Sequence, residues 1–248
     1  MQLGELLPDS FRHRRHTTLL IAIVIAFAAR PLIGDGPDAS LVFSLAVLAM
    51  MLVSLYSIEV DELVGERHAL VARRRRQSIV GWVLFTLAIF ERLGALIAPG
   101  PRLFVVGAIG WLLFFAFVAW SELRSLLIHR EVTGETISLA ISVYLLIGFC
   151  WSLLYILIFL NQSDAFSFGG SPDVGATLAA HPERSFPIFV YFSLTTISTV
   201  GFGDITPVSL SARYAAVAEA ITGQFYLAIL VARLVGMQMS RSSRPGEE

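Results

Sequence analysis

The sequence predicts an all-α membrane protein with six membrane-spanning helices, one short re-entrant helix and an extended segment directly after it. The chain of 248 residues is 56% hydrophobic and only 15% charged, and its mean hydropathy is +0.73. A soluble domain would carry charge on about a quarter of its residues. Six apolar stretches approach the ~20 residues that a helix needs to cross the hydrocarbon core. The basic residues are all arginines, and most of them lie in the segments that would share one side of the membrane.

The six predicted spans are separated by short polar segments. The first is followed at once by the second and shows no small-residue cleavage site, so we do not expect a cleavable signal peptide. The predicted spans cover residues 17–33, 41–58, 79–97, 103–120, 137–160 and 210–237.

Arginine placement predicts that both termini are cytoplasmic. With the N-terminus inside, twelve arginines fall in cytoplasmic segments and three in outer segments, which is a strong positive-inside bias. We expect the chain to lie in a plasma membrane, the inner membrane if its source is bacterial. The twelve are Arg12, Arg14, Arg15, Arg67, Arg73, Arg74, Arg75, Arg76, Arg124, Arg130, Arg241 and Arg244.

The spans fall into two predicted domains. A four-helix bundle is followed by a cytoplasmic linker helix, in which Leu123, Leu126, Leu127 and Arg130 recur at helical spacing. The predicted segments are a cytoplasmic N-terminus over 1–16, the bundle over 17–120, the linker over 121–136, the second domain over 137–237 and a tail over 238–248. We expect this tail to be too short for a nucleotide- or calcium-sensing domain.

The second domain contains a segment that does not fit a simple helical hairpin. An outer loop over 161–186 is rich in Gly, Ser and Pro, and the apolar stretch over 187–198 is too short to cross the membrane. The sequence "TVGFGD" follows at 199–204, before the last span. Irregular backbone at membrane depth is tolerated only where protein buries it or where it lines a water-filled cavity.

Carbonyl groups in such a segment need partners, and a dehydrated cation can be that partner. Four copies of "TVGFG" around an axis would stack rings of carbonyl oxygens, with the Thr199 hydroxyl as the innermost ring. Gly201 and Gly203 suit this arrangement, because consecutive carbonyls face one way only if some residues adopt backbone angles that side chains disfavour. Val200 and Phe202 would point away from the axis, and Asp204 would lie at the outer mouth.

The sequence "TTISTVGFGD" resembles the signature of tetrameric potassium channels. In that family the motif is the selectivity filter, with a pore helix before it and the pore-lining inner helix after it. The resemblance is specific from about Ile137 to the end of the sixth span. For the first four spans, it rests only on the total number of six predicted spans. It implies an outer helix over 137–160, a pore helix over 187–198, a filter over 199–204 and an inner helix over 210–237.

The resemblance implies roles for residues at and beside the filter. Phe202 stands where tyrosine is commonest in the family, so no phenolic hydrogen bond from that position to the pore helix is available. Thr195 stands where some members carry a glutamate that pairs with the filter acid, so Asp204 is expected to lack that carboxyl partner. The K⁺ ligands are expected from Thr199, Val200, Gly201, Phe202 and Gly203, with filter support from Asp204, Thr195, Thr196, Ser198, Tyr191 and Phe192.

Two residues of the sixth span carry open alternatives. Gly223 matches the inner-helix hinge of the family, and the alternative is close helix packing through a small residue. Glu219, one turn earlier, is an acid at membrane depth and therefore a functional candidate. It is expected to bond the hydroxyls of Thr195 or Thr196, or to face the cavity and attract cations.

Other features exclude some functions and leave others open. No catalytic constellation, nucleotide-binding loop or metal-ligand spacing is present, so we expect no enzyme and no cofactor apart from the permeant K⁺ ion. The net charge of −1 does not suggest nucleic acid as a binding partner.

Cys150 lies alone in an apolar run, where no second cysteine of the chain could pair with it. The arginine cluster Arg73, Arg74, Arg75 and Arg76 is expected to anchor topology, with anionic lipid binding as the alternative.

The predicted function is passive, potassium-selective conduction through a homotetramer. The fourth span carries no charge between Arg102 and Glu122, so we do not expect steep voltage gating. Three alternatives remain: a weakly selective cation channel, a subunit of a potassium uptake transporter, and a non-conducting sensor or accessory subunit.

Overall fold

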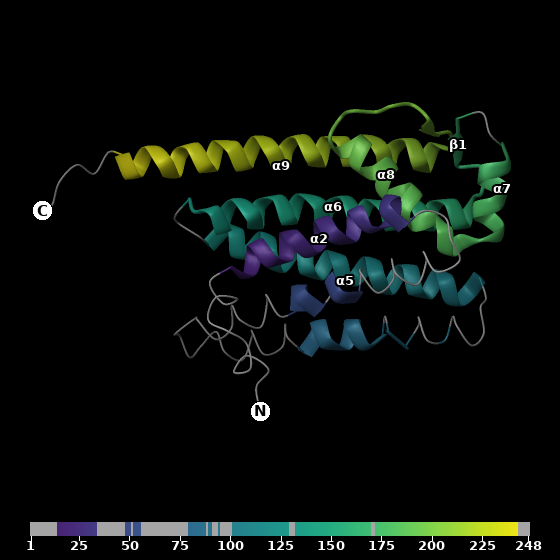
Figure 1. Ribbon diagram of the computed structural model, residues 1–248. Coiled ribbons are helices and arrows are strands. Elements are labelled where there is room, and N and C mark those ends of the chain that lie inside the picture. The colour runs from purple at the N-terminus through teal and green to yellow at the C-terminus, as the bar shows by residue number, and fades with distance from the viewer. Residues whose placement is uncertain are drawn as a thin grey trace, which may run out of the picture.

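The molecule is an all-α membrane protein whose long helices lie roughly side by side (Figure 1). The structure, a computed structural model, describes residues 14–33, 48–50, 52–55, 79–87, 89–90, 94, 101–128, 132–169 and 172–242. Within those residues, three helical stretches are long and apolar enough to cross a membrane, and two apolar helices are shorter. The three long stretches are Leu103–Ile128, Gly134–Asn161 and Leu210–Met239, and the shorter ones are His16–Ala28 and Ser185–Ile197.

Four of the six predicted spans coincide with described helices. The first, fourth, fifth and sixth correspond to α2 (Arg15–Ile33), α5 (Pro101–Ile128), α6 (Gly134–Asn161) and α9 (Leu210–Ser242). The predicted second and third spans lie mostly outside the described residues, and the parts within the description, between 48 and 55 and between 79 and 90, are helical. The count of six spans therefore stays a prediction.

Helices α5 and α6 form the centre of the bundle. They are joined by only five residues, and so short a connection makes consecutive helices antiparallel neighbours. Phe114, Phe115 and Val118 of α5 have no exposed surface, and the ring of Phe115 lies 5.7 Å from that of Phe149 in α6. Helix α2 packs on α6 as well, so α6 contacts both the first helix and the later elements.

Within the described residues, the predicted linker over 121–136 does not form a helix of its own, because 121–128 continue α5 and 134–136 belong to α6. Helix α5 continues without a break through Ile128, well beyond the predicted span end at residue 120. Its buried face continues too, because Leu126 packs against α6 beside Leu139. Helix α6 then begins at Gly134, where the Thr133 side chain caps it by accepting a hydrogen bond from the amide of Thr136.

The segment between α6 and the last helix is also more ordered than the predicted loop over 161–186. It contains β1 (Phe166–Phe168), α7 (Pro172–Ala180) and the 3₁₀ helix η2 (Pro182–Arg184), followed by the short helix α8 (Ser185–Ile197). Strand β1 pairs antiparallel with β2 (Ile205–Pro207), so that Phe166 lies opposite Pro207 and Phe168 opposite Ile205. The chain on both sides of α8 is therefore tied together by a two-stranded sheet.

An aromatic cluster joins this segment to the bundle. Phe166 of β1 points into the core, where its ring lies 4.9 Å from that of Phe189 in α8. Tyr155 of α6 lies 4.9 Å from Phe192 of α8 in an edge-to-face arrangement. Such aromatic pairs contribute about 0.5–1.5 kcal/mol beyond the area that they bury. The cluster fixes α8 at one end of the bundle (Figure 1).

Helix α9 contacts α8 and α6 along one side and exposes large apolar side chains elsewhere. Tyr214, Phe225 and Ile229 are 71%, 65% and 64% exposed in the single chain. These side chains form an apolar surface that neighbouring chains or lipid would cover in a membrane.

Candidate functional site

The candidate site is the segment that follows α8. The helix ends at Ile197, and the amides of Thr199 and Gly201 turn back to the carbonyls of Thr196 and Thr195, at 3.0 and 3.1 Å. All residues from 198 to 204 are exposed in the single chain. The carboxyl end of α8, which carries the negative end of the helix dipole, is thus directed at the start of this segment.

The backbone of the segment alternates in handedness. Thr199, Gly201 and Gly203 have φ values of +61°, +50° and +79°, and Thr199 is the only non-glycine residue with positive φ within the described part of the chain. A regular strand has φ near −120 to −140°, so every second residue departs from strand geometry. For a β-branched residue such as Thr199 a positive φ is unusual, and conformations of this kind cluster at functional sites.

The two glycines are required by backbone conformation and not by lack of space. A Cβ atom added to Gly201 or Gly203 would meet nothing within 4 Å in the single chain. A residue with a side chain in the left-handed region nevertheless costs about 1–2 kcal/mol. The conformational requirement is therefore separate from packing.

Tyr191 of α8 supports the outer part of the segment. Its hydroxyl donates a hydrogen bond of 2.8 Å to Asp204 Oδ2, and its ring stacks on Phe202 at a centroid distance of 6.2 Å and an interplanar angle of 2°. The hydrogen bond to Asp204 raises the pKa of the Tyr191 phenol. Asp204 Oδ1 also accepts from the amide of Ile205. Asp204 thus has a phenol as its partner. This partner comes from Tyr191, and not from position 195, where some channels carry a glutamate and this chain carries Thr195.

The predicted supporting hydroxyls bond within their own helix. Thr195 and Thr196 both donate to the carbonyl of Phe192, and Ser198 donates to the carbonyl of Leu194. Phe192 itself is buried in the aromatic cluster, where its ring packs on those of Tyr155 and Phe166. Of the predicted support residues on α8, Tyr191 contacts residues 199–204 with its side chain, through a ring contact with Phe202 and a hydrogen bond to Asp204.

Glu219 does not bond Thr195 or Thr196, and it does not face a cavity, which corrects both expectations. Its carboxyl group is completely buried, accepts a hydrogen bond from the Tyr155 hydroxyl of α6 and lies within hydrogen-bonding distance of the Ser193 hydroxyl of α8. Ser193 lies one turn nearer the helix start than Ile197, on the face of α8 that meets α9. Sequence reasoning missed Tyr155 and Ser193, and the signal that could have found them is a polar group inside an apolar stretch.

Gly223 lies where α9 packs most closely on the end of α8. A Cβ atom there would lie 2.6 Å from both Cγ1 and the carbonyl oxygen of Ile197. Helix α9 runs unbroken from Leu210 to Ser242 through this position. Tyr144 of α6 donates to the same carbonyl at 3.1 Å. The structure thus gives Gly223 a packing role, and a hinge at this residue stays a prediction.

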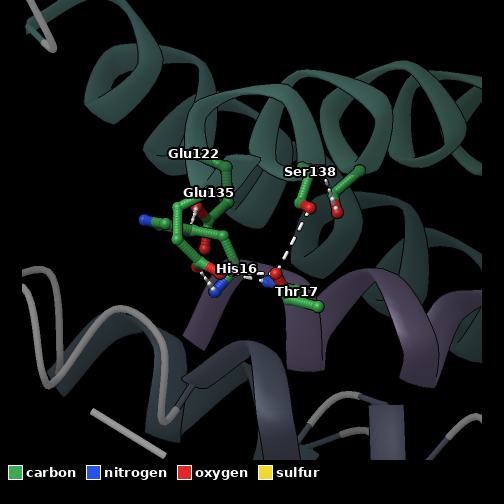
Figure 2. A network of polar contacts seen from close by, with 6 residues as sticks. His16, Thr17, Glu122, Glu135 and Ser138 are labelled. Carbon is green, nitrogen blue, oxygen red and sulfur yellow. Dashed lines mark hydrogen bonds and ion pairs between the residues drawn. The ribbon is translucent and has the colours of Figure 1, made fainter. Parts of the chain in front are cut away.

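A second polar network lies at the opposite end of the bundle, where α2 and α6 begin (Figure 2). Glu135 of α6 accepts from the backbone amides of His16 and Thr17, at 3.0 and 3.4 Å, and from the Thr17 hydroxyl. The Thr17 hydroxyl also lies 3.3 Å from that of Ser138. His16 Nδ1 lies 3.3 Å from Glu122 Oε2 of α5, and both side chains are buried. Sequence reasoning had not singled out these residues.

Several predicted features lie outside the description. Arg73, Arg74, Arg75 and Arg76 are outside the described residues, as are parts of the predicted second and third spans. Within the described part of the chain, no group of three or more His, Cys, Asp or Glu residues is arranged to hold a metal ion.

Comparison with known proteins supports an ion channel. A family model described as "Ion channel" matches residues 173–239, which include α8, residues 198–204 and most of α9. Protein LctB of Geobacillus stearothermophilus is 32% identical over 91 residues, which cover 37% of this chain. The aligned region spans 62% of the length of that relative. No solved structure matches the chain.

Proposed function

We propose that the chain is one of four identical subunits around a potassium-selective pore, and that residues 199–203 form its filter. The observation that carries the proposal is the alternating backbone at Thr199, Gly201 and Gly203, in an exposed segment at the carboxyl end of α8. Alternating handedness lets successive carbonyls turn to one side, where they replace the hydration shell of a cation. The ion-channel match over 173–239 supports the same assignment.

The need for four chains follows from geometry. One chain contributes a single carbonyl at each level, whereas a K⁺ ion between two levels needs a ring of carbonyls around it. The exposed apolar side chains of α9, among them Phe225 and Ile229, supply a surface for neighbouring subunits or lipid. A tetramer in detergent by native mass spectrometry would support this assembly, and a conducting monomer or dimer would contradict it.

The chain's own residues act on the ion by orientation and charge. The backbone carbonyls and the Thr199 hydroxyl are the proposed ligands, and the carboxyl end of α8 adds a favourable potential for a cation at the inner end of the filter. Asp204, held by Tyr191, keeps a negative charge at the outer mouth. The arginine distribution supports cytoplasmic termini in a plasma membrane, and Arg73 to Arg76 are proposed to contact anionic lipid.

The test is a planar bilayer recording of purified protein in a potassium-to-sodium gradient. We expect the reversal potential to follow potassium. Gly201→Ala should abolish conduction, because alanine at φ +50° costs about 1–2 kcal/mol in each of four filters. Gly236→Ala is the matched control, since an added Cβ in that part of α9 meets nothing within 4 Å.

The outcomes separate the alternatives. Equal sodium and potassium permeability would replace the filter assignment by a weakly selective cation channel. Potassium flux without unitary currents would favour a transporter subunit. A silent bilayer that contains correctly assembled tetramers would favour an accessory subunit.

A further inference from the structure

A buried hydrogen-bonding group joins three helices behind the proposed filter. Glu219 of α9, Ser193 of α8 and Tyr155 of α6 each have no exposed surface. Ser193 Oγ lies 2.5 Å from Glu219 Oε1 and 2.7 Å from the carbonyl oxygen of Gly148 in α6. The Tyr155 hydroxyl donates to the other carboxyl oxygen, Oε2. The group therefore connects α8 to both of the long helices, α6 and α9, that pack on it most extensively within the described residues.

The number of hydrogens in this group determines its protonation state. A serine hydroxyl carries one hydrogen, and a backbone carbonyl carries none. If Ser193 donates to Gly148, the contact between Ser193 Oγ and Glu219 Oε1 needs a hydrogen from the carboxyl group. If Ser193 instead donates to an ionised Glu219, its oxygen faces the Gly148 carbonyl at 2.7 Å with no hydrogen between them. A proton on Oε1 satisfies both contacts.

The charges around Glu219 favour the same state. Within the described residues, no arginine or histidine forms an ion pair with its carboxyl group. The phenols and the thiol on the packed helices are Tyr144, Cys150 and Tyr155 on α6, Tyr191 on α8, and Tyr214 and Tyr226 on α9. Glu135 of α6 accepts hydrogen bonds from the start of α2, and Arg233 of α9 donates to the carbonyl of Leu127 in α5. Arg184, at the start of α8, and Arg213, near the start of α9, are exposed. A buried carboxylate without a cationic partner is costly, and the group keeps its proton instead.

The contact is placed to act on the filter. Glu219 and Gly223 are four residues apart on α9, and Ser193 and Ile197 are four residues apart on α8, so the two contacts lie one turn apart on facing helix surfaces. Ile197 is two residues from Thr199. Anything that moves Ser193 away from α9 therefore also moves the start of the filter segment.

We infer that Glu219 is a neutral acid that donates its proton to Ser193 and thereby positions the pore helix and the filter. It is a positioning residue and touches no ion. Ionisation would remove the donor and place a charge against the Ser193 oxygen. The role in the filter rests on the proposed function, whereas the protonation state does not depend on it.

The first experiment therefore measures the proton directly. Infrared spectra of the purified full-length protein at neutral pH should contain a C=O stretch of a protonated carboxyl group, and Glu219→Gln should remove that band. Asp173→Asn is the matched control, because it removes an exposed carboxyl group in the first turn of α7 and should leave the band unchanged. A spectrum without the band in the unsubstituted protein would overturn the inference, whether or not the protein conducts potassium.

The second experiment measures the effect on the filter. Glutamine has an amide group that can donate to Ser193 and a carbonyl that can accept from Tyr155, so Glu219→Gln should keep potassium conductance within about twofold of the unsubstituted protein. Glu219→Ala should lower the conductance about tenfold or more, because it leaves the buried Tyr155 hydroxyl without its acceptor and the Ser193 oxygen without its donor. In a Tyr191→Phe background, which removes the ionisable phenol beside Asp204, alkaline pH should lower the conductance reversibly in the channel that keeps Glu219 and not in the channel that also carries Glu219→Gln. Equal losses of conductance in Glu219→Gln and Glu219→Ala would overturn the positioning role. So would identical pH profiles of the conductance with and without Glu219→Gln.

Discussion

Glu135, in the first turn of α6, caps the start of α2 by accepting hydrogen bonds from the backbone amide and the hydroxyl of Thr17 (Figure 2). The first turn of a helix has amides without intrahelical partners, and a carboxylate there also meets the positive end of the helix dipole. The contact spans 118 residues of sequence and links the first helix to the outer helix of the proposed pore.

We therefore expect Glu135→Ala to loosen α2. The loss of this partly buried cap should lower the free energy of unfolding by about 1 kcal/mol, as other cap deletions do. The measurement is hydrogen exchange of the backbone amides in detergent. We expect the substitution to speed exchange in α2 and to leave exchange in α9 unchanged. Asp173→Asn, which removes an exposed acid, is the control. Unchanged exchange in α2 would show that the cap does not hold this helix.

Tyr191→Phe should weaken the filter without disturbing the fold. The substitution removes the hydrogen bond to Asp204 and keeps the ring that stacks on Phe202. Because the hydrogen bond is exposed to solvent, the expected effect on overall stability is small. The measurement is the fraction of time that single channels conduct at sustained potential, and a double-mutant cycle with Asp204→Asn isolates the pair. Additive effects of the two substitutions would show that the pair does not interact.

The same pair predicts a pH dependence. The pKa of Tyr191 is raised, so its hydroxyl remains a donor at and somewhat above the ordinary tyrosine value of 10.0. Its contribution to the filter is present below that range and is lost as the pH rises through the raised pKa. This loss should disappear in Tyr191→Phe, whereas the alkaline loss that we attribute to Glu219 should persist in that variant.

Gly223→Ala should impair the channel through packing. The new Cβ would lie 2.6 Å from the Ile197 carbonyl, and a backbone group cannot move aside without shifting the end of α8. A change of this kind costs about 1–3 kcal/mol. Gly236→Ala should be neutral or stabilising by up to about 1 kcal/mol, since that helical position is open. The measurements are thermal stability of the tetramer and potassium conductance. Equal behaviour of the two variants would contradict a packing role for Gly223.

Conductance should change only gradually with voltage. Steep gating needs three or four charges per subunit, because one charge crossing the field supplies about 2.3 kcal/mol per 100 mV. Helix α5 is a single helix with no charged residue between Arg102 and Glu122, and Glu122 is buried beside His16. Macroscopic conductance in symmetric potassium is the measurement. A sigmoid curve with about a dozen gating charges per tetramer would show that this interpretation of α5 is wrong.

The sequence by itself determined the membrane class of the protein, the positions of α2, α5, α6 and α9, and the short helix before "TVGFGD". These features depend on composition and on local patterns, because a stretch of about 20 apolar residues forms a helix in a membrane whatever its neighbours are. The two glycines of the filter segment were also predictable, since they mark backbone angles that other residues disfavour.

The tertiary structure alone decided which polar groups meet. Glu219 bonds Ser193 and Tyr155 in place of the threonines suggested by sequence proximity, and Asp204 bonds Tyr191. Glu135 caps a helix that begins more than a hundred residues earlier. Such contacts depend on the rotation and the relative height of packed helices, and a shift of one residue turns a side chain by about 100° around its helix. Local sequence patterns carry little information on that rotation, because helices that are apolar on all sides can pack on several faces.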